Sequence, residues 1–175
     1  KMSQYKNKDL IVIALGSGAL GESEEIVPCL TNTCFVLTPN GYINANKLKI
    51  GDMVTTTDNR NVKIINYTKH THIITQNTEL LPYLIPKNYY GKNNPSIDTL
   101  ISGKHMYYNN RRWTNPIKEK LKQKSVDRIT YYNFQLPNYI TDDLVVNNMK
   151  MESWDGLKPD SKRFYRWNKY KKYAV

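Results

Sequence analysis

The stretch TNTCFVLTPNGYINANKLKIGDMVTTTD, residues 31–58, contains the clearest strand and turn signals of the chain. An apolar run beginning at Cys34 leads into TPNGY, whose Asn and Gly favour the tight connections of β-hairpins. A similar connection, TDNRN, follows at 57–61, and between the two the segment KLKIGD predicts a tight turn ending at Gly51. Two hairpin connections so close together predict antiparallel β-structure.

The rest of the chain continues this pattern. Its dominant period is two, with many β-branched and aromatic residues. One short helix is expected in NPIKEKLKQK at 115–124, where a proline occupies the first turn. TELLPYLIPK at 78–87 contains two prolines and predicts an ordered loop or a single turn. The predicted class is all-β, with strands near 9–15, 33–38, 53–57, 61–74, 99–108, 128–137 and 142–151.

Length and composition limit the class of protein. A chain of 175 residues is long enough for one domain with its own core and needs no disulfides. Its two cysteines form neither a disulfide framework nor a metal-ligand motif, which predicts an intracellular, reducing compartment. The apolar run LIVIAL at 10–15 is too short to span a bilayer, so no membrane span is expected. Because the chain begins with Lys1 and has no signal-peptide pattern, we interpret it as part of a longer protein.

Charge and composition suggest three regions. The linker-like segment GSGALGESEE belongs to an upstream arm at 1–32, the domain is expected at 33–154, and a basic, aromatic tail follows at 155–175. The formal net charge is +11, and a tail of this kind can bind nucleic acid nonspecifically, dock on an acidic protein surface, or simply be solvated. The basic residues expected to contact nucleic acid are Lys162, Arg163, Arg166, Lys169, Lys171 and Lys172.

Three blocks of residues, in a definite order along the chain, carry a resemblance to a known family. The first is the 34–58 part of the opening stretch, with its Cys-Phe, Thr-Pro-x-Gly and Gly-Asp-x-Val elements. The second is DTLISGKHMYY at 98–108, in which a serine stands three residues before a histidine. The third is ITYYNFQLPNYITDDLVVNNMKMESW at 129–154, with an Asn-Gly-like turn near its end. Together the three blocks resemble the Hint (hedgehog/intein) family. The resemblance implies a horseshoe-like fold of long curved, mostly antiparallel strands, and a β-sandwich is the alternative architecture.

The resemblance also implies a reaction on the protein's own backbone that needs no cofactor. Hint domains attack the carbonyl before their first residue, so Cys34 would attack Thr33 and convert the peptide bond into a thioester. His105 would protonate the leaving nitrogen, and Ser102 would support the distorted peptide. Cys34 taken alone is more typical of core packing, because a free cysteine behaves as a small hydrophobic residue.

Other positions depart from the family pattern. Glu152 and Ser153 stand where inteins carry His-Asn, and neither forms a succinimide, so no protein splicing is expected. Asn133 stands where the family has an aspartate or a histidine. Asp142 stands where the family often has another histidine, and it would act as a general base or orient His105. Cys29 is interpreted as structural or incidental.

Two functions of different class remain open. The first is a self-processing domain that cleaves the Thr33–Cys34 bond without splicing. The second is a catalytically inactive module, because the departures at Asn133 and Asp142 leave the expected catalytic positions altered. PYLIPKNYYG at 82–91 and the ESW ending resemble a Hint branch of large DNA viruses, and this resemblance implies a virion or minor capsid component. His70 and His72 face the same side of a predicted strand but lack further ligands nearby in sequence, so no metal site is expected.

Overall fold

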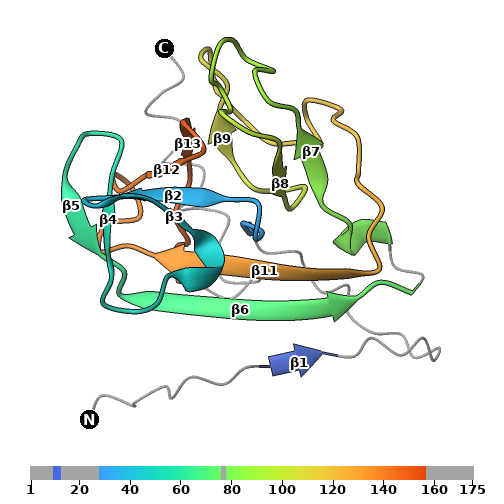
Figure 1. Cartoon of the computed structure of the whole chain (residues 1–175), viewed down its shortest axis with the longest axis horizontal. Coiled ribbons are helices and arrows are strands. Elements are labelled where there is room, and N and C mark those ends of the chain that lie inside the picture. The colour runs from blue at the N-terminus through green and yellow to red at the C-terminus, as the bar shows by residue number, and fades with distance from the viewer. Residues whose placement is uncertain (1–9, 13–27, 76–77, 157–175) are drawn as a thin grey trace.

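The computed structural model describes residues 10–12, 28–75 and 78–156 and shows a protein built almost entirely of strands (Figure 1). Within this part the helical elements are two short 3-10 turns. The all-β prediction and the mostly antiparallel arrangement are therefore confirmed. The elements are β1 Leu10–Val12, β2 Phe35–Thr38, β3 Gly41–Asn44, η1 Ala45–Lys47, β4 Met53–Thr55, β5 Asn61–Lys63, β6 Asn66–Ile73, η2 Thr78–Leu80, β7 Tyr83–Ile85, β8 Thr99–Ile101, β9 Tyr107–Tyr108, β10 Trp113–Thr114, β11 Arg128–Gln135, β12 Leu144–Val146 and β13 Met149–Met151.

The longest strands, β6 and β11, form an antiparallel pair that runs along one side of the molecule (Figure 1). The short β1 adds to the other edge of β6 in parallel orientation. A six-stranded sheet in the order β10-β9-β13-β12-β2-β3 lies next to this pair, and the β4–β5 and β7–β8 hairpins complete the architecture. The core lies between these sheets and includes Val36, Ile64, Phe134 and Met151, all at most 1% exposed.

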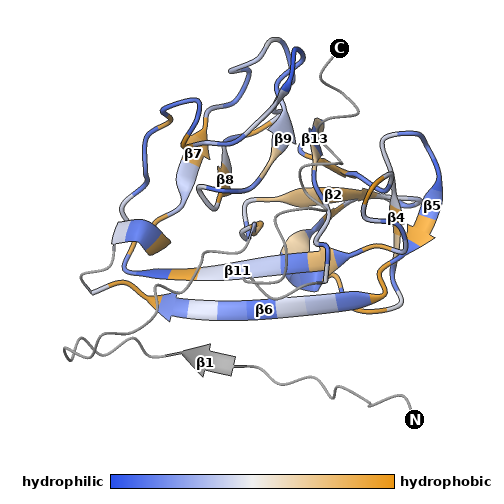
Figure 2. Cartoon of the chain, turned by 180° about the vertical axis from the view of Figure 1, so that it is seen from behind, coloured by the Kyte–Doolittle hydropathy of each residue, from blue (hydrophilic) through white to orange (hydrophobic). Residues whose placement is uncertain are grey.

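Hydropathy follows this packing. Figure 2 shows β2 coloured as hydrophobic and β6 as largely hydrophilic. Along β2 half-buried and fully buried residues alternate, as the period of two predicts for a strand with one face on the core. β6 is half-buried over most of its length, and it is paired along both edges, with β11 on one side and β1 on the other.

The predicted hairpin turns are confirmed. The β2–β3 register pairs Thr38 with Gly41, so Pro39 and Asn40 form a two-residue loop. Gly41 has φ +97°, a conformation that glycine adopts without steric cost. Further along, β12 and β13 are joined at Asn147 and Asn148, whose φ angles of 49° and 68° are those of a tight hairpin turn and are tolerated by asparagine.

The helix predicted at 115–124 was wrong. Residues after Pro116 form turns, and Lys120 adopts φ +54°, which ends any helical continuation. The chain then extends along β7, where the Leu84 N–H donates to the carbonyl of Lys122 at 3.0 Å. Because a helix of about ten residues is marginal in water, backbone pairing with β7 outweighs the local helix propensity.

Two further predictions need correction. Residues 78–87 hold η2 and the strand β7 rather than a loop or single turn, because the two prolines flank β7 and remove no donor from within it. The expected strand at 99–108 is two short strands, β8 and β9, separated by a turn at Gly103 and Lys104. That turn positions the predicted site residues.

Candidate active site

Cys29 and Ser102 contact each other through two hydrogen bonds. The Cys29 N–H donates to Ser102 Oγ at 2.8 Å, and the Ser102 N–H donates back to the Cys29 carbonyl at 3.1 Å. Next to Cys29, Leu30 bridges to both Ile101 and Tyr132, so the segment is held between β8 and β11. Ser102 is thus directed at the nitrogen of the Pro28–Cys29 peptide bond, and the side chains of Cys29 and Ser102 are both buried.

His105 is tied to Ser102 by a turn. The His105 N–H donates to the Ser102 carbonyl at 3.1 Å, so the two residues are the first and last of a four-residue β-turn. The Ser-x-x-His spacing therefore brings the two residues close together, and His105 is only 3% exposed. Gly103 within the turn lies against Tyr83 and Ile117, and an added Cβ would approach Tyr83 to 2.7 Å. This close approach explains why the turn needs a glycine.

Cys34, the residue chosen from sequence, lies in the main core. It is fully buried, its thiol donates to the carbonyl of Leu100 at 3.4 Å, and its N–H donates to the carbonyl of Thr31 at 3.1 Å. Neither contact involves Ser102 or His105. Burial raises the pKa of the Cys34 thiol to about 11, because desolvation penalises the thiolate. A thiol with so high a pKa is almost wholly protonated near neutral pH and is a poor nucleophile.

The raised pKa predicts a loss of stability at alkaline pH. Below about pH 9 the thiol is neutral in both folded and unfolded chains, so its contribution is fully present there. As pH rises from 9 to 11, the unfolded chain loses this proton first, and on the order of 3 kcal/mol of stability is lost. Urea unfolding at pH 8 and pH 10.5 measures the effect. Cys34→Ala is expected to show the smaller loss, whereas equal losses in both proteins would contradict the assignment.

Thr33, the expected scissile residue, is held by Asn147. The Asn147 side chain donates from Nδ2 to the Thr33 carbonyl at 3.0 Å and to Thr99 Oγ1 at 2.8 Å. Its Oδ1 accepts the Phe35 N–H at 2.9 Å. Asn147 is 1% exposed and joins β2, β8 and the β12–β13 turn. The peptide between Thr33 and Cys34 is therefore part of a tightly bonded junction.

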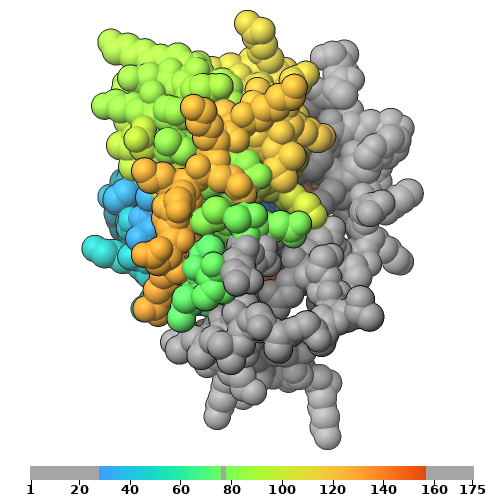
Figure 3. Space-filling view, turned by 90° about the vertical axis from the view of Figure 1, so that its right-hand side faces the viewer, coloured from blue at the N-terminus to red at the C-terminus, as the bar shows by residue number. Residues whose placement is uncertain are grey.

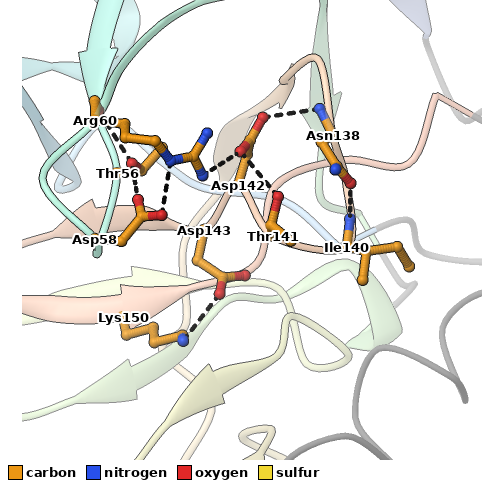
Figure 4. Close-up of polar contacts among 9 residues, drawn as sticks. All are labelled: Thr56, Asp58, Arg60, Asn138, Ile140, Thr141, Asp142, Asp143 and Lys150. Atoms are coloured by element: carbon orange, nitrogen blue, oxygen red, sulfur yellow. Dashed lines mark hydrogen bonds and ion pairs between the residues drawn. The ribbon is translucent and has the colours of Figure 1, made fainter.

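Asp142 lies in a separate polar network (Figure 4). Its carboxylate is 1% exposed and accepts hydrogen bonds from Arg60 at 2.8 Å, from the Asn138 N–H at 2.8 Å and from Thr141 Oγ1 at 3.2 Å. Figure 4 shows Arg60 between Asp142 and Asp58. These contacts fix the loop before β12 against the β4–β5 hairpin and account for the burial of the carboxylate. None of them joins Asp142 to His105.

The side chains that depart from the family pattern, Glu152 and Asn133 among them, make hydrogen bonds within the fold. Glu152 is 1% exposed, and its carboxylate accepts hydrogen bonds from the Met106 N–H at 2.8 Å and from the Tyr139 hydroxyl at 3.0 Å. Ser153 is buried beside it. Asn133 lies on β11 and donates to Thr68 Oγ1 at 3.1 Å. Glu152 thus supports the backbone immediately after His105.

The sequence predicted Ser102 and His105 as site residues, and Cys29 was interpreted as structural or incidental. The chain offers two cysteines five positions apart, and the strong hairpin signal after Cys34 favoured that residue. The pairing of Cys29 with Ser102 joins residues 73 positions apart and depends on how the strands assemble. No local pattern in the sequence carries that information.

Other kinds of site receive no support in the described ranges. No group of three His, Cys, Asp or Glu side chains suited to a metal ion occurs there, and His70 and His72 lie on β6 opposite β1. No helix in this part of the protein is long and apolar enough to cross a membrane. The basic residues of the tail from 157 onward, and most of the upstream arm, lie outside the described residues.

Comparison with known proteins gives the family. The chain matches the sequence profile of the Hint domain over residues 28–155, beginning one residue before Cys29. Its fold is similar to the gp41-1 intein, with a TM-score of 0.50 and 16% identity over 72% of this chain and 98% of the intein. It is also similar to the bacterial intein-like domain from Clostridium thermocellum, with a TM-score of 0.51 and 15% identity over 71% of this chain and 97% of that domain. No curated protein matches the sequence significantly. The chain belongs to the Hint domain family.

Proposed function

We propose that this Hint domain forms a thioester at Cys29 and cleaves the Pro28–Cys29 bond without splicing. The observation that carries the proposal is the 2.8 Å hydrogen bond from the Cys29 N–H to Ser102 Oγ. It places the serine of the Ser-x-x-His motif on the nitrogen that must leave. Cys34 is likewise joined by its nitrogen to the carbonyl of the residue before it, Thr33. Its N–H, however, donates to the Thr31 carbonyl, and burial raises the pKa of its thiol.

The proposed step is an acyl shift from nitrogen to sulfur. Cys29 Sγ bonds to the Pro28 carbonyl carbon through a five-membered ring, and the bond from that carbon to the Cys29 nitrogen breaks. The thiol loses its proton and the nitrogen gains one, so the products are a thioester and a free amine. By accepting the N–H hydrogen bond, Ser102 makes the nitrogen more basic. His105, three residues away in the same turn, is the proton donor.

The thioester would then be resolved by water or an added nucleophile. Splicing and C-terminal cleavage need a residue that cyclises at the end of the domain, and Glu152 and Ser153 stand there. The carboxylate of Glu152 is engaged with Met106 and Tyr139, which supports a structural role. The proposed outcome is one cut, releasing a segment that ends at Pro28.

Intact mass spectrometry of the full chain tests this function. The chain is incubated at pH 7 with and without dithiothreitol or hydroxylamine. We expect both nucleophiles to produce a segment ending at Pro28, as its thioester adduct or its hydroxamate, together with a fragment that begins at Cys29. A cut between Thr33 and Cys34 would contradict the choice of cysteine. No cut over several days would contradict the self-processing function.

A second candidate is a catalytically inactive structural module. Its supporting observation is the burial of the site, because Cys29 is only 4% exposed and Pro28 before it is also buried. Nucleophiles from solution therefore have little access to the bond unless the segment opens. The viral origin, the virion role and the intracellular location stay predictions.

A further inference from the structure

The positive charge of the described protein is concentrated in one lobe, residues 82–124. This lobe contains β7 to β10 and their connections, and it carries nine basic and two acidic side chains, a formal net charge of +7. The other described residues carry seven basic and eight acidic side chains, a net charge of −1. The nine basic residues are all exposed, and they are Lys87, Lys92, Lys104, Arg111, Arg112, Lys118, Lys120, Lys122 and Lys124.

Hydrogen bonds join three basic segments of the lobe, which are the 86–94 loop, the β9–β10 connection and the 115–124 segment. Asn110, in the β9–β10 connection, contacts the 86–94 loop through Asn94 at 2.9 Å and the Tyr90 carbonyl at 3.0 Å. On its other side, the Asn109 side chain donates to Glu119 at 3.3 Å, which joins the connection to the 115–124 segment. The basic segments are thus held together in one assembled lobe. In Figure 3 the green and yellow segments of the lobe lie together at the top of the view.

Most of this charge is not offset within the lobe. Glu119 pairs with Arg112 at 3.4 Å, and the Asp98 carboxylate accepts the backbone N–H of Lys87 at 2.8 Å. Two carboxylates cannot neutralise nine cations, so the lobe repels itself and attracts polyanions. Its loops also present exposed asparagine side chains, and Tyr89 is 51% exposed. Asparagine and tyrosine side chains, together with Lys and Arg, are the groups that contact phosphates and sugars of nucleic acids.

We propose that the 82–124 lobe binds nucleic acid through its phosphodiester backbone. The binding is independent of sequence and does not depend on cleavage at Cys29. It is also separate from the basic tail, because the lobe carries its own charge surplus. Contacts of this kind release counterions, so the affinity falls steeply with salt.

Fluorescence anisotropy with a labelled 20-base-pair DNA duplex tests the lobe in the full chain. The lobe variant carries Arg111→Gln, Lys118→Gln and Lys122→Gln. A matched control carries Lys47→Gln, Lys49→Gln and Lys63→Gln, which remove the same charge from exposed positions outside the lobe. Loss of three phosphate contacts is expected to reduce the slope of log affinity against log salt by about 2 to 3 in the lobe variant only.

A third protein separates the lobe from the tail. It carries glutamine at the six basic tail positions named above, alone and combined with the lobe substitutions. We expect the lobe substitutions to reduce the slope in this background as well. The proposal would be overturned if the lobe and control variants had equal effects on the slope. It would also be overturned if the tail substitutions reduced the slope and the lobe substitutions did not, or if the chain did not bind the duplex at low salt. Binding of anionic vesicles in preference to DNA or RNA would overturn the choice of nucleic acid.

Discussion

Cys29→Ala is expected to abolish thiol-induced cleavage completely, whereas Cys34→Ala is expected to leave the rate within about threefold of the parent protein. The first substitution removes the proposed nucleophile, and no other thiol is bonded to the same peptide. The second removes a buried thiol that donates to the Leu100 carbonyl, and it keeps the backbone N–H that donates to Thr31. Cleaved fraction against time, measured by intact mass at a fixed dithiothreitol concentration, gives both rates.

Two further variants separate chemistry from folding. Cys29→Ser keeps the backbone N–H that bonds Ser102 but replaces the thiol by a weaker nucleophile, so a slower, hydroxylamine-sensitive cleavage is expected. Ser102→Ala removes the acceptor of that bond and is expected to slow cleavage at least about tenfold. The reverse pattern, in which Cys34→Ala stops cleavage and Cys29→Ala does not, would assign the reaction to the Thr33–Cys34 bond.

Asn147→Leu is expected to destabilise the domain by about 3 to 5 kcal/mol. The amide makes three hydrogen bonds in a buried place, and their loss leaves the Thr33 carbonyl and the Phe35 N–H without these partners. Leucine also fits poorly at the left-handed φ of 49°. Urea unfolding at neutral pH measures the difference in the free energy of unfolding.

The neighbouring Asn148 provides a matched control. It has the same left-handed backbone, φ 68°, but its side chain is exposed and accepts one hydrogen bond, from the Tyr42 hydroxyl. Asn148→Leu is expected to cost about 1 kcal/mol, mostly through the backbone conformation. If the two variants lost the same stability, the buried amide of Asn147 would not be the stabilising element.

Local sequence signals predicted much of the fold because they act over a few residues. The TPNGY and Asn147-Asn148 turns form where the residue types demand them. Such signals failed elsewhere, as two segments show. The helix predicted at 115–124 gives way to backbone pairing with β7, a partner far away in the sequence. The strand predicted at 99–108 is interrupted by a local turn, which the His105 N–H closes by donating to the Ser102 carbonyl.

The family and the all-β class follow from residues that lie near one another along the chain. The proximity of Ser102 and His105 does too, because their spacing is that of one turn. The contact between Cys29 and Ser102 depends instead on tertiary structure, because β8 and β11 bring Cys29 to Ser102 while Cys34 lies in the core. The tertiary structure also placed Asp142 in an ion pair with Arg60, and it gathered three basic segments into one lobe. Pairing between distant strands sets these relations, and a single chain read in order carries no local signal for them.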